Sequence, residues 1–231
     1  IPVIAIHRDF KKDMPEVLKA FQAFETLATP FHAIHRDALR KTESIITTIK
    51  ELLGGEHKIG FLVHSIARGN LKPMVSDSEN TTLSADDLAI TGQAMAYNLY
   101  TWVDSLQREG LFAADTRIIA FTSEGNKRVI PGYGAVAAAK SSLEAIVRQI
   151  AVEFANKGIR ANCIQAGVTD TDSLRRIPDS SLLVNASLRR NPYGRLTLPS
   201  DVADAVYLLC LSEASWITGN IIKADGGESL C

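Results

Sequence analysis

A tyrosine and a lysine seven positions apart, Tyr133 and Lys140, are the residues of this sequence best suited to chemistry. The segment after the Pro131-Gly132 step is rich in alanine, so it is predicted to be helical. Seven residues at about 100° each leave the two side chains about 20° apart on one helix face. There the ammonium would lower the pKa of the phenol, whose hydroxyl can donate to a carbonyl oxygen as negative charge develops. The alternative is a chance pairing on an ordinary helix.

Composition limits the classes of protein to which the chain can belong. Its 231 residues, 46% of them hydrophobic, are enough for one large domain with a substantial core. A formal net charge of -1 argues against nucleic acid as a partner. No apolar stretch approaches the roughly 20 residues that span a bilayer, so no membrane association is predicted. The three cysteines lack metal or redox spacing and are typical of a cytoplasmic protein with reduced thiols and no metal site.

The elements that must position the tyrosine and the lysine alternate along the whole chain. Apolar, β-branched runs are typical of parallel strands covered on both faces, and helical patterns separate them. Helices are predicted to open near Asp13, Ser84 and Pro199, each beside an N-capping pattern. This alternation predicts an α/β fold, a doubly wound three-layer Rossmann fold with a parallel sheet, as a single domain over residues 1–231. The expected strands are 3–6, 31–34, 59–64, 117–122, 160–165 and 221–223.

Small, polar and glycine-containing segments follow most of these predicted strands. In doubly wound folds ligands bind at the carboxyl ends of the strands, so these segments predict a cofactor cleft. Any single segment could be an ordinary turn, but several along one sheet edge favour the cleft. The segments are residues 7–9, 36–38, 64–69, 122–124 and 165–171.

With these motifs, the sequence resembles the short-chain dehydrogenase/reductases and, within them, the enoyl-acyl-carrier-protein reductases. Most of the superfamily has its tyrosine where this chain has Val136, whereas Tyr133 gives the Tyr-x6-Lys spacing typical of enoyl reductases. The motifs VHSIA, NCIQAGVTDT and ITGNIIKADGG agree as well, and residues 167–196 look most like the smaller, NADPH-using bacterial enoyl reductase III. The resemblance implies reduction of the C2=C3 double bond of trans-2-enoyl thioesters, carried by acyl carrier protein or coenzyme A, in fatty-acid or related biosynthesis.

The resemblance also implies roles for individual residues. Tyr133 would hydrogen-bond the thioester carbonyl, Lys140 would hold the nicotinamide ribose, and Ser123 matches the catalytic serine position of the wider superfamily. The active-site asparagine stays open, because Asn98 and Met95 compete for its position. The implied cofactor contacts are Asp37 and Ala38 at the adenine, His64, Ser65 and Ile66 beneath the cofactor, Gly167 and Val168 at the carboxamide side, and Thr171 at the pyrophosphate.

One departure from the family pattern is large. The family's first strand and its Gly-x-x-x-Gly-x-Gly loop, which presents backbone N–H groups to the pyrophosphate, have no counterpart in this sequence. We therefore expect a preceding segment of about 30–35 residues. Without its central strand the sheet is expected to expose two unpaired edges. A naturally shortened, non-catalytic subunit is the alternative.

The cofactor depends on the end of the first predicted strand. Arg8 suits the 2′-phosphate of NADPH, whereas Asp9 would bind ribose hydroxyls and favour NADH if that strand ended one or two residues later. NADPH is the prediction. The competing enzyme hypothesis is a 3-ketoacyl or other carbonyl reductase of the same superfamily.

Two interaction surfaces are also expected. The family assembles through two helices, here about residues 85–109 and 135–156, which predicts a homotetramer. Residues 172–195 form a predicted lid over the substrate. Its five arginines, against two aspartates, could dock an acidic carrier protein or the phosphates of coenzyme A, or could simply form a solvated face. These arginines are Arg175, Arg176, Arg189, Arg190 and Arg195.

Overall fold

The structure is a computed structural model that describes residues 2–10, 12–25, 30–78, 81–175, 177 and 180–231. The chain divides into two compact units, residues 1–58 with 104–111 and residues 59–103 with 112–231, and each is described by itself. A single domain over residues 1–231 stays a prediction. Within the described residues, no helix is both long enough and apolar enough to cross a bilayer.

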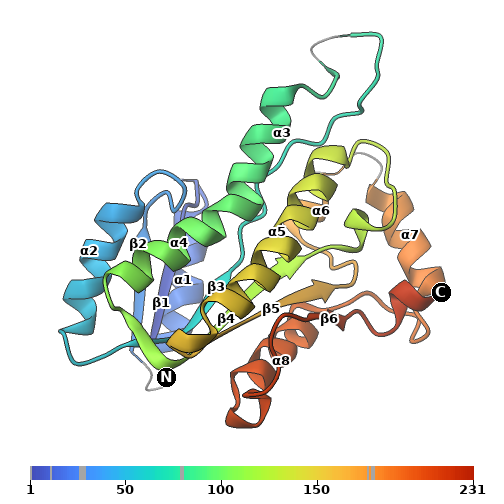
Figure 1. Ribbon diagram of the computed structural model, residues 1–231. Helices are drawn as coiled ribbons and strands as arrows, with labels where there is room; N and C mark the ends of the chain where they lie inside the picture. Colours follow the sequence, from blue (N-terminus) through green and yellow to red (C-terminus); the bar gives the residue numbers. More distant parts are fainter. Residues whose placement is uncertain (1, 11, 26–29, 79–80, 176, 178–179) are drawn as a thin grey trace. The chain divides into compact units, whose positions relative to one another are not determined.

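The first unit is a pair of parallel strands with two helices (Figure 1). Strand β1 (Val3–His7) pairs with β2 (Phe31–His35) from Val3 opposite Phe31 to His7 opposite His35. Helix α1 (Met14–Glu25) places the Phe21 ring 5.0 Å from the rings of both His7 and Phe31. Helix α2 (Thr42–Leu53) ends at Gly54, whose φ of 60° closes the helix in the left-handed conformation.

The second unit is a four-stranded sheet of order β3-β4-β5-β6 in which all neighbours are parallel. Helix α3 (Ala85–Gly92) opens on a capping box at Ser84, as predicted, and continues through a π-helical turn, η2, into α4. Residues 104–111, which include the end of α4, belong to the first unit, and the second unit resumes with β4. The remaining bounds are β3 (Ile59–His64), η2 (Gln93–Tyr97), α4 (Asn98–Arg108), β4 (Phe112–Thr122), η3 (Glu124–Asn126), α5 (Gly134–Glu153), η4 (Ala155–Lys157), β5 (Ile159–Ala166), α6 (Asp172–Arg175), α7 (Ser180–Arg190), α8 (Pro199–Cys210), η5 (Ser212–Ala214), β6 (Ile221–Ala224) and η6 (Glu228–Leu230).

Alternate residues of the strands point to opposite faces, and each face carries its own core. Ile118 on β4 packs with α4 and α5, whereas its neighbour Ile119 packs with α8. Figure 1 shows α4 and α5 on one side of this sheet and α8 on the other. The helix–sheet–helix layering of a doubly wound α/β fold with parallel strands is therefore confirmed.

All six predicted strands are present, and the largest difference in length is in β4. The sequence predicted a start at Arg117, but β4 begins at Phe112, because a register shift between Ile59 and Phe61 lets the earlier residues join the ladder. The expected pair of sheet edges is also observed. Within the described residues β1 pairs only with β2, and β3 pairs only with β4.

Candidate functional site

Tyr133 lies at the start of α5, at the end of the segment that connects β4 to this helix. It is the N-cap residue, with φ -97° and ψ 5°, so the helix proper begins one residue later than the sequence pattern suggested. Its hydroxyl donates to Ser123 Oγ over 3.3 Å. The ring lies so close to Gly125 that a Cβ there would be 2.5 Å from Tyr133 Cε1. A glycine at position 125 therefore makes room for the phenol beside Ser123.

The predicted lowering of the Tyr133 pKa is wrong. Burial raises the pKa of the phenol above 10.0, and the hydrogen bond with Ser123 lowers it by less. The physical reason is that the ring packs against the apolar cluster of Met95, Val136 and Ala139, where an unscreened phenolate is costly. The phenol therefore stays protonated at neutral pH and keeps a proton that it can donate.

Lys140 lies two turns further along α5 and is buried, with 8% of its surface exposed. Its ammonium donates to the Phe121 carbonyl at the end of β4 over 2.7 Å. Burial is the main cause that lowers its pKa from 10.5 to about 8. The ammonium is thus held at the carboxyl edge of the sheet, where the sequence placed it.

His64 and Asn98 extend the site on the β3 side. Burial, and secondly repulsion by Lys140, lower the pKa of His64 to about 4, while a hydrogen bond with Asn98 opposes the shift. His64 is therefore neutral at pH 7. Asn98 is buried at the first position after the π-helical turn, whereas Met95 joins the apolar cluster around Val136. Of the two candidates for the active-site asparagine, Asn98 is the one that meets a polar partner at the site.

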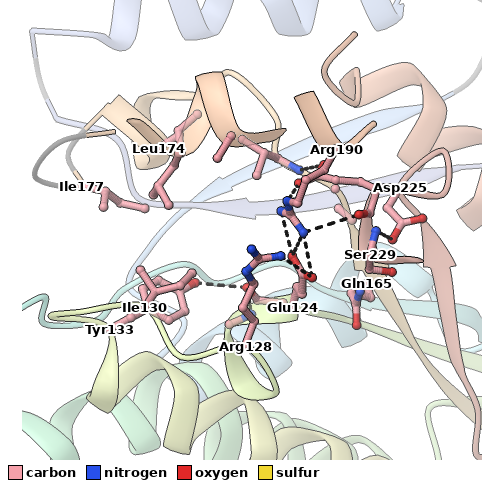
Figure 2. A pocket seen from close by; sticks show the side chains of 18 of the residues that line it. Glu124, Arg128, Ile130, Tyr133, Gln165, Leu174, Ile177, Arg190, Asp225 and Ser229 are labelled. Carbon is pink, nitrogen blue, oxygen red and sulfur yellow. Dashed lines mark hydrogen bonds and ion pairs between the residues drawn. The ribbon is translucent and has the colours of Figure 1, made fainter. Parts of the chain in front are cut away.

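A cavity of about 330 Å³ opens beside Tyr133 and Ser123 (Figure 2). Apolar side chains from the segment before α5 and from the 172–190 region form one end, where Figure 2 shows Leu174 and Ile177 facing Ile130. Charged and polar side chains form the other end. The polar and charged residues of that end are Glu124, Arg128, Gln165, Arg190, Asp225, Glu228 and Ser229.

Arg190, at the end of α7, ties three segments of the cavity wall together. It contacts Glu124 over 3.0 Å and Glu228 over 2.7 Å, and the second oxygen of Glu228 accepts the Val168 N–H over 3.1 Å. No local pattern in the sequence predicts this network, because Arg190 and Glu228 are 38 residues apart and neither belongs to a recognisable motif.

The network corrects the proposed docking role of Arg190, whose side chain is only 17% exposed and is committed to carboxylates. Arg175 is likewise paired with Asp170 and Asp172, and Arg195 with Asp201. Arg189 is exposed. Arg176 lies outside the described residues. Three of the lid arginines are therefore paired with carboxylates, most of which lie outside the lid segment, so these residues do not form a patch of five unpaired cations.

The backbone groups of the loop after β5 contact the protein itself, whereas the family resemblance implied contacts with the cofactor. The Val168 N–H, expected to meet a carboxamide, donates to Glu228, and the Val168 carbonyl accepts the Thr197 N–H over 3.1 Å. Both backbone groups are therefore engaged within the protein. A Cβ on Gly167 would be 2.3 Å from Thr197 Oγ1, so the close approach requires glycine. The Thr171 hydroxyl accepts the Leu174 N–H over 3.3 Å.

The segment after β3 continues from His64 with an exposed Ser65 and a half-buried Ile66. It then packs so tightly that a Cβ on Gly69 would be 2.8 Å from a methyl carbon of Thr91. This close packing fixes the path of the chain past the end of the strand.

In the first unit, the implied cofactor residues contact residues of the same unit. Arg8 follows β1 directly and forms an ion pair with Asp37 over 2.8 Å, with 56% of the Arg8 side chain exposed. Asp9 contacts His7 Nδ1 over 2.7 Å. The Ala38 carbonyl accepts the Thr42 hydroxyl over 3.3 Å. Strand β1 extends one residue further than predicted, to His7. The side chains of Asp9 and Asp37 both have partners from their own unit.

Comparisons with known proteins show the family to which the chain belongs. Residues 9–229 match the family described as enoyl-(acyl carrier protein) reductase. The chain is 29% identical over 185 residues to the enoyl-acyl-carrier-protein reductase (NADH) of Bacillus subtilis, covering 80% of this chain and 69% of that protein. It is 28% identical over 189 residues to the 3-oxoacyl-acyl-carrier-protein reductase of Chlamydia trachomatis, covering 81% and 72%. The crystal structure of the Bacillus cereus enoyl-acyl carrier protein reductase with NADP+ and indole naphthyridinone superposes with a TM-score of 0.85 at 25% identity, covering 100% of this chain and 86% of that one. This chain therefore belongs to the enoyl-(acyl carrier protein) reductase family of NAD(P)H-dependent oxidoreductases.

Proposed function

We propose that the protein reduces the C2=C3 double bond of trans-2-enoyl thioesters, carried by acyl carrier protein or coenzyme A, with NADPH as the reductant. The observation that carries the proposal is the position of the phenol. Tyr133 lines the cavity and contacts Ser123, whereas residue 136, where most of the superfamily has its tyrosine, is a valine with 3% exposure in the core. A phenol moved one turn away from the lysine suits an acceptor oxygen remote from the carbon that is reduced.

The residues present fit a nicotinamide cofactor. Within the part of the chain that the structure describes, His64 Nε2 is buried and has no hydrogen-bond partner, at the end of β3 beside Lys140. Such an atom needs a partner, and the carboxyl ends of parallel strands are where dinucleotides bind. An ammonium has three donors, so Lys140 can contact ribose hydroxyls in addition to the Phe121 carbonyl.

The protein's own contribution to the reaction is to stabilise charge. When bound, the cofactor would supply a hydride to the β-carbon, and negative charge would collect on the thioester oxygen until the α-carbon takes up a proton from water. Tyr133 keeps its proton because burial raises its pKa, and it donates a hydrogen bond to that oxygen. Ser123 orients the phenol through their 3.3 Å contact. Lys140 orients the ribose and contributes positive charge while it stays protonated.

The experiment that tests the proposal compares substrates in wild-type protein and in Tyr133→Phe. A crotonyl thioester with NADPH should be reduced, and Tyr133→Phe should lower kcat/KM about 100-fold or more with nearly unchanged NADPH affinity, because only the donor to the developing charge is lost. Stopped assays and fluorescence titration of the cofactor measure the two quantities. Full turnover by Tyr133→Phe would contradict the assigned role.

A carbonyl reductase is the second candidate, because one of the similar proteins is named a 3-oxoacyl-acyl-carrier-protein reductase. Reduction of a 3-ketobutyryl thioester, with no turnover of the crotonyl thioester, would establish it in place of the enoyl reductase. Family membership favours either enzyme over a non-catalytic subunit. A cytoplasmic location and a role in fatty-acid biosynthesis belong to the same proposal.

A further inference from the structure

Three buried polar atoms on the wall of the cavity have no hydrogen-bond partner within the described residues. They are Gln165 Oε1, Ser229 Oγ and Arg190 Nε. Buried polar atoms are nearly always paired, because leaving one unpaired sacrifices the hydration it had in the unfolded chain. Three such atoms around one cavity therefore point to a ligand that supplies the missing partners.

The surrounding contacts hold these atoms in place. Gln165 is 1% exposed on β5 and lies opposite Thr122 of β4, the residue that precedes Ser123. The two Nη atoms of Arg190 are bound to carboxylates, so its orientation is set. The Ser229 N–H donates to Asp225 over 3.2 Å. Figure 2 shows Gln165, Ser229 and Arg190 together at the charged end of the cavity, away from Leu174 and Ile177.

The charges of this wall restrict the ligand group to a neutral one. Three carboxylates and two guanidinium groups line the cavity, which leaves a net charge of -1. An anionic group would meet excess negative charge, and a cationic group would compete with Arg190 for Glu124 and Glu228 and with backbone N–H groups for Asp225. The orphaned atoms include an acceptor, a donor and a hydroxyl that can act as either. A group that both donates and accepts hydrogen bonds matches all three.

We propose that Gln165, Ser229 and Arg190 Nε form a subsite for a hydroxyl or a secondary amide of the substrate, while the alkyl part lies at the apolar end. This proposal rests on the proposed function and adds a specificity determinant to it. The polar group can belong to the thiol side of the thioester, as an amide of the carrier arm, or to the acyl chain, as a hydroxyl. Both sources offer the same chemistry to the subsite.

The test uses pairs of enoyl thioesters that differ in one polar group. The first pair is crotonyl N-acetylcysteamine and crotonyl ethanethiol, which differ in the amide of the thiol side. The second pair is a hex-2-enoyl ethyl thioester with and without a 6-hydroxyl. For each pair the ratio of kcat/KM is measured in wild type, in Gln165→Met and in Ser229→Ala. Gln149→Met, an exposed glutamine on α5, is the matched control.

In wild type one of the pairs should show a preference of about 10-fold for the polar member, and the pair that shows it identifies the source of the group. Gln165→Met should bring that ratio of kcat/KM close to 1, which means that the preference is lost. Ser229→Ala should lower the ratio by a smaller factor, and Gln149→Met should leave it unchanged. Because the readout is a ratio within each protein, general damage to activity cancels. Ratios that are the same in wild type and Gln165→Met would overturn the subsite.

A binding measurement separates failure of the subsite from failure of the proposed function. Calorimetry with the saturated thioesters, which are not reduced, gives the ratio of binding affinities within each pair. If no enoyl thioester is reduced but the binding ratio still depends on Gln165, the proposed function is wrong and the subsite stands. If enoyl thioesters are reduced but neither ratio depends on Gln165, the proposed function stands and the subsite is wrong.

Discussion

At the scale of single residues, Arg8 is the side chain that carries the proposed preference for NADPH. It follows β1, is 56% exposed and is held by Asp37 over 2.8 Å, so a 2′-phosphate would have to compete with that carboxylate. Arg8→Leu should raise the KM for NADPH about 10- to 100-fold and change the KM for NADH little, because one charge-assisted contact is lost. Initial-rate kinetics with both cofactors measure this. Equal effects on the two would leave Arg8 a surface residue and return Asp9 as the ribose ligand.

Lys140 gives a second prediction at this scale, through the pH dependence of stability. Its pKa is about 8 in the folded protein because it is buried, and 10.5 is its ordinary value. Between these values the unfolded chain binds more protons, so the contribution of Lys140 to the free energy of unfolding rises with pH across this window. The rise should be on the order of 2–3 kcal/mol and should be absent in Lys140→Met.

Urea denaturation of both proteins at pH 7.5 and pH 10 measures that difference. The comparison of the two proteins removes the contribution of every other titrating group. A constant difference between wild type and Lys140→Met over this range would mean that the lysine is not buried as the structure shows.

At the scale of elements, the short helix η3 and the start of α5 together set the position of the phenol. Gly125→Ala would place a Cβ 2.5 Å from the Tyr133 ring and force the phenol away from Ser123. We expect kcat to fall about 10- to 100-fold, because a displacement near 1 Å is enough to misalign a donor. Gly60→Ala is the matched control, since a Cβ at that position meets no atom within 4 Å. Unchanged kcat in Gly125→Ala would show that the contact with Ser123 does not position the phenol.

Helix α7 acts at the same scale through its last residue. Arg190 joins this helix to Glu124, directly after Ser123, and to Glu228 in η6. Glu228 in turn holds the Val168 N–H in the loop after β5. Three elements that form the cavity are thus linked by one guanidinium group, which explains why the arginine is buried and not free for a partner.

At the scale of the whole molecule, the predicted homotetramer depends on apolar surface that the fold leaves uncovered. Helix α5 adds little such surface, because Leu143, Val147 and Ile150 are buried within the protein itself. Exposed apolar side chains remain on α3 and α4, where Ile90 is 53% and Tyr100 is 50% exposed. Such surface is typical of an interface. Light scattering at micromolar concentration should give the mass of four chains, and a monomeric mass would contradict the prediction.

The sequence by itself determined the strand–helix order and the positions of Tyr133 and Lys140. Parallel strands covered on both faces must be apolar runs, and caps such as Ser84 act within a few residues, so these features are local and readable. The tertiary structure decided the rest. It placed Asn98 beside His64 and Met95 in the apolar cluster around Val136, and it paired Arg190 with Glu228 across 38 residues. It also occupied the Val168 N–H and raised the pKa of Tyr133 where the local pattern predicted a decrease. Each of these depends on burial or on contacts between distant segments, which no local spacing encodes.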